Sequence, residues 1–305
     1  MLFVLRDKYI GADTIGYVRF FQVDIRRFSF YMLFQEDVMR FEIGFRLYVK
    51  LISLITNNYT IYFLINGIII FGTLLCFSFK YTKNPFLFFF LFITLGTYSF
   101  LETGLRQALA MMICLWSVDF IKDRKPIRFI LTVILAYFFH KSAMIFVILY
   151  PLCNIKKHDY MIFVYSFFSF VLLIGFSTFQ GFFNSLLGYE YEIEETNNGG
   201  IFMMVLLILF SFSFYLLHNK KEEEKTLNVI LHLSLLTLMF WLLRLVSRTA
   251  ERICYYYIYG LYIYFSQAAR YDRDFWSSLL KGLLILACFA LFIYRNIGVN
   301  YSFFW

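Results

Sequence analysis

Charged side chains are scarce in this sequence. Of its 305 residues, 16% are charged and 61% are apolar, and the mean hydropathy is +0.69. Soluble globular chains have about 25% charged and about 45–50% apolar residues. The polar residues are therefore too few to cover a water-facing surface, which excludes a soluble enzyme and a disordered chain. We predict an all-α, polytopic integral membrane helical bundle that forms one domain over residues 1–305, with about 8–10 transmembrane helices.

Motifs for metals, nucleotides and nucleophilic hydrolysis are also missing. The five cysteines have no C-x-x-C spacing, and no Walker loop, G-x-G-x-x-G, H-E-x-x-H or G-x-S-x-G motif occurs. We therefore expect no metal and no cofactor. The formal net charge of +8 does not indicate nucleic acid as a partner, because many basic residues lie in short loops beside apolar runs and do not form a stripe on a soluble face.

Runs of about 20 mostly apolar residues mark the membrane spans. Basic loops at residues 122–128 and 218–225 and after Arg270 orient the chain, since positively charged loops stay in the cytoplasm. This orientation places residues 1–58 and the loop 181–200 on the outer side of the membrane. The predicted spans cover residues 61–79, two segments within 86–121, and then 129–153, 160–179, 201–217, 227–246, 253–265 and 279–294.

Two of the apolar stretches contain a break. Within 86–121, the sequence Glu102-Thr103-Gly104 predicts a tight turn between two helices. Within 129–153, His140-Lys141-Ser142 interrupts an apolar run whose two flanking loops are both basic and are therefore both expected in the cytoplasm. The chain must cross the membrane an even number of times between these loops. We predict a broken or re-entrant helix pair around His140.

The N-terminal segment, residues 1–58, conflicts with the same charge rule, because it is rich in arginine and yet is predicted outside. The later basic loops agree with one another and outweigh it. The chain begins MLFVLRDK, which looks like the end of an apolar helix. An upstream transmembrane helix missing from this chain, or an alternative start site, would explain an arginine-rich segment on the outer side.

A second group of ionisable residues remains once the cytoplasmic loops are set aside. Arginines near helix ends often extend to the membrane interface, and a histidine at a helix break can be purely structural. A structural role for these residues therefore stays open. A set drawn from three segments at one depth favours an anionic substrate, since arginine binds phosphate oxygens through two parallel hydrogen bonds. The set comprises Arg106, His140 and Lys141, and the arginines that recur every four residues on one helix face, Arg244, Arg248 and Arg252.

Three blocks carry polar residues in an order typical of one family. The central block, Gly104 to Leu152, contains R-Q-x-(I/L)-A beginning at Arg106 and, after a basic turn, F-H-x-S around His140. The start RDKYIGADTIGYVRFF fits the signature R…G-x-D-(T/S)-x-x-Y, and SRTAERICYYY fits an R-x-x-Y/F block. In these blocks the sequence resembles the EpsG family of polysaccharide polymerases, relatives of the Wzy O-antigen polymerases.

The resemblance implies a multi-pass glycosyltransferase of the bacterial cytoplasmic membrane, acting on the outer face. It would move a growing glycan from undecaprenyl diphosphate onto the non-reducing end of a new lipid-linked repeat unit, with a flippase and a chain-length regulator as partners. Arginines would stabilise the leaving diphosphate, and a base would take the acceptor proton, in the order His140, Asp13, Glu102. The expected catalytic residues are His140, Arg106, Asp13 and Glu102, and the expected substrate-binding residues are Arg6, Arg106, Arg244, Arg248, Arg252, Lys141, Tyr17, Tyr255 and Tyr256.

Other activities stay open. An O-antigen ligase uses the same donor chemistry. A flippase for lipid-linked oligosaccharides also needs cationic residues that face the bundle interior, but spread along a central cavity. A membrane acyltransferase and a non-catalytic scaffold are weaker alternatives, and clustering of the charges near the outer leaflet would favour the polymerase.

Overall fold

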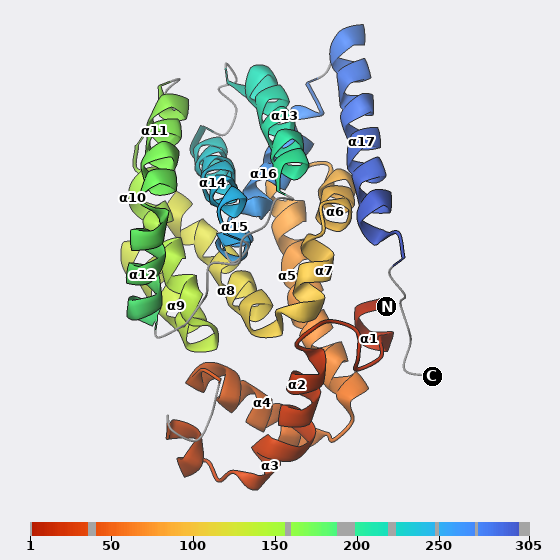
Figure 1. The fold of residues 1–305 in the computed structure, drawn as a ribbon, viewed down its shortest axis with the longest axis vertical. Helices are drawn as coiled ribbons and strands as arrows, with labels where there is room; N and C mark the ends of the chain where they lie inside the picture. The colour runs from red at the N-terminus through yellow and green to blue at the C-terminus, as the bar shows by residue number, and fades with distance from the viewer. Residues whose placement is uncertain are drawn as a thin grey trace.

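The computed structural model describes residues 2–35, 41–155, 160–187, 199–218, 224–247, 250–271 and 274–298. Within these ranges the chain is helical, and no β-strand occurs. Figure 1 shows a bundle of helices with the N-terminal elements gathered at one end of its long axis. The prediction of an all-α membrane bundle is confirmed.

The described residues before α5, 2–35 and 41–58, form short helices at that end of the bundle (Figure 1). Helix α1 packs against α5, and α4 packs against α9. The ammonium of Lys50 on α4 donates to the backbone carbonyls of Ile25 (3.0 Å) and Phe28 (2.7 Å), which ties α3 to α4. The elements are α1 (Leu2–Leu5), α2 (Thr14–Arg19), η1 (Phe20–Asp24), α3 (Ile25–Arg27), η2 (Tyr31–Phe34) and α4 (Ile43–Ile55).

Four helices in the described ranges are long and apolar enough to cross a membrane. Two bent helix pairs raise this number to six if each pair is one span: α6 with α7, bent by 63°, and α11 with α12, bent by 82°. The four long helices are α5 (Tyr59–Tyr81), α13 (Gly200–Leu217), α14 (Glu224–Leu242) with its extension η5 (Leu243–Leu245), and α17 (Phe275–Asn296). The bent pairs are α6 (Pro85–Thr94) with α7 (Thr97–Thr103) and α11 (Met161–Ile174) with α12 (Phe176–Leu187).

This number is lower than the 8–10 spans expected from sequence, because the other apolar segments form shorter or more polar helices. Helix α8 (Leu105–Lys122) carries Arg106, Asp119 and Lys122. Residues 181–187, which begin the predicted loop 181–200, belong to α12, and residues 188–198 lie outside the described ranges. The shorter helices are α9 (Pro126–Phe139), η4 (Lys141–Ile148), α10 (Leu149–Cys153), α15 (Glu251–Cys254) and α16 (Ile258–Ala268).

Both predicted helix breaks are present. Helix α9 ends at Phe139, His140 has an extended backbone, and η4 then packs back against α9 and α8, so the broken pair around His140 is confirmed. Gly104 separates α7 from α8. A further break lies at Gly96, which has a φ of +80°, a conformation that favours glycine.

Helices α14 and α16 form the centre of the bundle. Of the apolar stretch of α14, 89% is buried inside the protein, compared with 17% for α17, which lies at the periphery. The two central helices touch at Gly260, where a Cβ atom would lie 2.2 Å from the Cβ of Leu233. Small residues allow such close backbone approach between helices in membranes. The position of α16 therefore depends on Gly260.

Candidate functional site

A cavity of about 390 Å³, here called the Arg106 cavity, lies where the N-terminal segment meets the end of the bundle. Four parts of the chain supply its walls: the start of α2, the α7–α8 junction, the break after α9, and α15 with the turn that follows. Its lining residues are Ala12, Asp13, Tyr17, Phe100, Thr103, Gly104, Arg106, Gln107, His140, Glu251, Arg252 and Tyr255. Two arginines, two carboxylates and a histidine thus face one space.

Six of the residues predicted from sequence line this cavity. They come from blocks that are far apart in the chain, and the folding of the N-terminal segment against the bundle brings them together. The six are Asp13, Tyr17, Arg106, His140, Arg252 and Tyr255.

Glu42 was not predicted from sequence, although it holds two residues of this site in place. Its carboxylate pairs with the Arg106 guanidinium, and its Oε1 lies 3.0 Å from His140 Nδ1. The backbone N–H of Lys141 also points at Oε1, at 3.4 Å. Glu42 is 8% exposed, so it is buried against these donors. The sequence offered one signal, since a buried group of cations requires an acidic partner.

Glu251 plays a similar part on the opposite wall. Its carboxylate accepts hydrogen bonds from the Tyr255 hydroxyl and from Arg244 Nε, the latter at 2.9 Å. The Tyr255 ring stacks on Phe100, with ring centroids 4.1 Å apart. Arg244 therefore does not line the cavity. It holds Glu251, which does, in place from behind.

Arg6 and Glu102, both predicted in the site, connect the N-terminal segment to the bundle and do not line the cavity. Arg6 is fully buried, its Nη1 donates to the Glu102 carbonyl at 2.8 Å, and its guanidinium lies over the Phe3 ring. Thr14 Oγ1 donates to the same carbonyl at 3.1 Å. Gly11, at φ +93°, passes so close that a Cβ atom there would be 2.9 Å from this oxygen.

Hydrogen bonds between the sequence blocks support the lining residues from behind. Gln107 Nε2 donates to the Arg252 carbonyl at 2.5 Å, and the hydroxyls of Ser142 and Tyr256 are 3.0 Å apart. Tyr256 is therefore a buried support of the site and does not line the cavity.

Two predicted residues remain. Lys141 contacts Glu42 through its backbone and is not in the cavity lining. Arg248 lies outside the described residues.

Tyr17 is a neutral hydrogen-bonding group in this cavity. Burial raises the pKa of its phenol above the ordinary value, although the nearby Arg106 guanidinium acts in the opposite direction. The phenol therefore stays protonated around neutral pH. Among the described residues, no group of three or more His, Cys, Asp or Glu side chains is arranged to hold a metal ion.

Comparison with known families identifies the family of this chain. A model described as the EpsG family matches residues 1–305. The chain belongs to the EpsG family. This EpsG-family protein is thus a multi-pass membrane protein of the Wzy-like polymerase type, and its family points to a polymerase-type glycosyltransferase. Neither the curated proteins nor the solved structures produced a match.

Proposed function

We propose that the Arg106 cavity transfers a growing glycan from undecaprenyl diphosphate onto the non-reducing end of a lipid-linked repeat unit, on the outer face of the bacterial cytoplasmic membrane. One observation carries this proposal: Arg106, Arg252 and His140, from three separate blocks, line a single cavity at one end of a membrane bundle. These are the groups that a transfer with a diphosphate leaving group needs.

The diphosphate would bind between Arg106 and Arg252. Guanidinium groups form two parallel hydrogen bonds to phosphate oxygens and stay charged at any physiological pH. Helix α8 also begins at the cavity, because Gly104 at its N-terminus is a lining residue. The positive end of the helix dipole would add to the attraction for the anion. Both effects strengthen as the donor bond breaks and charge develops on the leaving group.

His140 would act as the base. Its Nδ1 lies against the Glu42 carboxylate, which keeps the proton on Nδ1 and makes Nε2 the basic nitrogen of the ring. Nε2 takes the proton of the acceptor hydroxyl while the hydroxyl oxygen forms a bond to the anomeric carbon of the donor sugar. The bond between that carbon and the diphosphate oxygen breaks, and undecaprenyl diphosphate leaves with the electron pair. Asp13 is the second candidate for the base because it also lines the cavity.

The remaining lining residues suit sugars. The stacked Tyr255 and Phe100 rings form an aromatic wall beside Arg252. Carboxylates accept hydrogen bonds from hydroxyl groups. Asp13 and Glu251, which lie in the lining on different walls, would therefore orient donor and acceptor sugars.

The test replaces Arg106 in cells and examines the length of the surface glycan on gels. We expect Arg106→Ala to lower polymerisation about 100- to 1000-fold, as for the loss of one transition-state donor, while single repeat units still reach the surface. Arg106→Lys, which retains a charge beside Glu42, controls for folding, and Arg128→Ala, in the exposed first turn of α9, should leave long chains unchanged. Unchanged long polymer in Arg106→Ala would refute the proposal, and loss of surface repeat units altogether would favour a flippase.

A further inference from the structure

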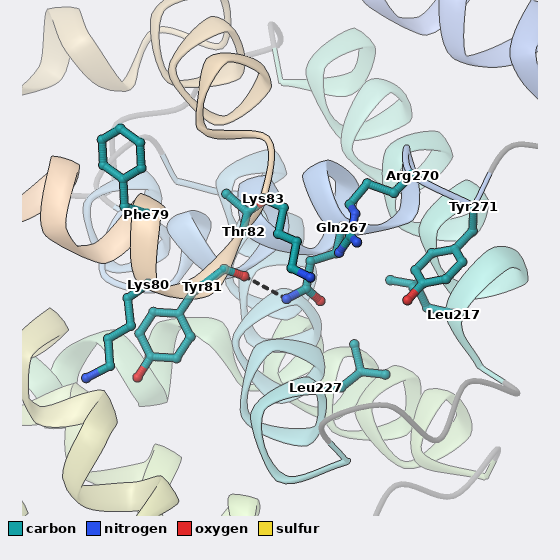
Figure 2. Close-up of a pocket in the computed structure, with 10 residues that line it drawn as sticks. All are labelled: Phe79, Lys80, Tyr81, Thr82, Lys83, Leu217, Leu227, Gln267, Arg270 and Tyr271. Atoms are coloured by element: carbon teal, nitrogen blue, oxygen red, sulfur yellow. Dashed lines mark hydrogen bonds between the residues drawn. The ribbon is translucent and has the colours of Figure 1, made fainter.

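A second cavity, of about 180 Å³, lies at the far end of the same helices and is here called the Lys83 cavity (Figure 2). Its walls come from the end of α5 and the turn after it, the end of α13, the start of α14, and the end of α16. Helix α16 connects the two sites, because Tyr255 precedes it in the Arg106 cavity and Gln267 lies in its last turn in the Lys83 cavity. The proposed transfer reaction makes no use of this second cavity.

Two cations converge in it. Figure 2 shows the Lys83 ammonium and the Arg270 guanidinium pointing toward the side chain of Gln267. The Gln267 amide is itself fixed, because its Nε2 donates to the Tyr81 carbonyl at 2.6 Å. Neither cation forms an ion pair with another residue in the described part of the chain.

The third cation near this cavity behaves differently. Lys80 turns away from Lys83 in Figure 2, and its ammonium pairs with Asp119 at 2.6 Å. The Tyr81 hydroxyl donates to the same carboxylate, also at 2.6 Å. Asp119 is thus engaged on the other side of α5. Among the described lining residues no side chain is acidic, so an anion in this cavity would meet the charges of Lys83 and Arg270.

The lining of the cavity also includes apolar side chains. Leu217 and Leu227 are two of them, and Phe79, which lies away from both in Figure 2 on the last turns of α5, is 68% exposed. Within a bundle whose outer surface contacts lipid, such a residue extends the cavity toward acyl chains. The cavity therefore joins a positively charged centre to a surface suited to hydrocarbon.

We propose that the Lys83 cavity binds the phosphate headgroup of an anionic phospholipid from the leaflet at this end of the bundle. Basic pockets between transmembrane helices on the cytoplasmic side are suited to such headgroups, because that leaflet carries anionic lipid. The basic turn 122–128 lies at the same end, with the Lys122 ammonium 5.4 Å from the centre of the Tyr81 ring. The positive-inside rule assigns this end to the cytoplasm. The lipid would hold the ends of α5, α13 and α16 together.

The experiment compares lipid binding by purified full-length protein in detergent, using phosphatidylglycerol and phosphatidylcholine as probes in native mass spectrometry. We expect the wild type to retain phosphatidylglycerol selectively and the double variant Lys83→Gln/Arg270→Gln to bind it about 30-fold more weakly. The charge-conserving variant Lys83→Arg/Arg270→Lys should retain binding. Lys125→Gln, which removes a lysine paired with Asp123 outside the cavity, is the matched control.

Two results would overturn the proposal. One is equal retention of phosphatidylglycerol by the wild type and the double glutamine variant. The other is displacement of the lipid by inorganic phosphate at equal concentration, which would identify a soluble phosphate as the ligand. Because polymer formation is measured separately with Arg106→Ala, failure of the lipid site would leave the proposed transfer reaction standing.

Discussion

Glu42 provides the sharpest test of how the Arg106 cavity works. Glu42→Gln keeps the shape of the side chain and removes its charge. The amide retains one oxygen, which can accept a hydrogen bond from either Arg106 or His140. The other of these two residues then faces the N–H₂ group of the amide, which cannot accept a hydrogen bond. Because Nδ1 of His140 lies 3.0 Å from Glu42 Oε1, the orientation and the tautomer of the imidazole both depend on this contact.

The size of the effect follows from the bond that is lost. A hydrogen bond to a charged group contributes about 1.5–3 kcal/mol, and a factor of ten in rate corresponds to about 1.4 kcal/mol. We therefore expect kcat for polymerisation to fall about 10- to 150-fold. The KM for the lipid-linked donor should not rise, since Arg106 keeps its charge and gains freedom to bind phosphate.

The assay is chain elongation by purified protein with lipid-linked repeat units, alongside the thermal midpoint of each variant in detergent. Glu42→Asp, which retains the carboxylate, should recover part of the rate. Asp7→Asn is the control in the same N-terminal segment. Among the described residues, the Asp7 carboxylate accepts a hydrogen bond only from the nearby Tyr9 N–H, so this variant should elongate chains at the normal rate. A wild-type kcat in Glu42→Gln would show that Glu42 does not position His140.

Two further predictions concern the fold. Gly260→Ala should lower the free energy of unfolding by about 1–3 kcal/mol, because the new methyl group would overlap α14. A lower thermal midpoint would show this loss. Gly72→Ala, with open space around it, should leave the midpoint unchanged. Gly11→Ala should loosen the N-terminal segment, because the substitution is strained at φ +93° and crowds the Glu102 carbonyl. Limited proteolysis should then cut this segment faster than in the wild type, and equal rates would contradict the assigned anchor.

Much of the fold was predictable from residue patterns. Apolar runs located the four long helices, and the polar interruptions at Gly104 and His140 coincide with helix breaks. The break at Gly96 was not predicted, because a single glycine within an apolar run gives no sign of whether its φ will be positive. The short α16 was expected to be a full span, since its sequence is apolar, but the chain turns at Tyr255 before it begins.

Six of the residues that line the cavity were predicted from sequence, but the different roles of the predicted residues were not. Arg6 and Arg106 each begin one of the signature blocks, yet Arg6 donates to the backbone carbonyl of Glu102 and Arg106 lines the cavity. Arg252 and Arg244 are eight residues apart on one predicted face, but only Arg252 reaches the cavity lining. The depth of a charged residue in the membrane follows from its position in its own span. The side chains that surround it depend on how separate spans pack against one another.

The sequence by itself determined that this is a helical membrane protein, because too little polar surface was present to face water. Its signature blocks also determined which ionisable residues were candidates for catalysis and substrate binding. Only the tertiary structure decided that Glu42 joins Arg106 to His140, and that Lys83 and Arg270 share a second cavity at the opposite end. The physical reason is that membrane insertion depends on transfer of each segment into lipid, which is a local property. Pairing of buried charges depends on which helices meet, and the order of residues along the chain does not specify those contacts.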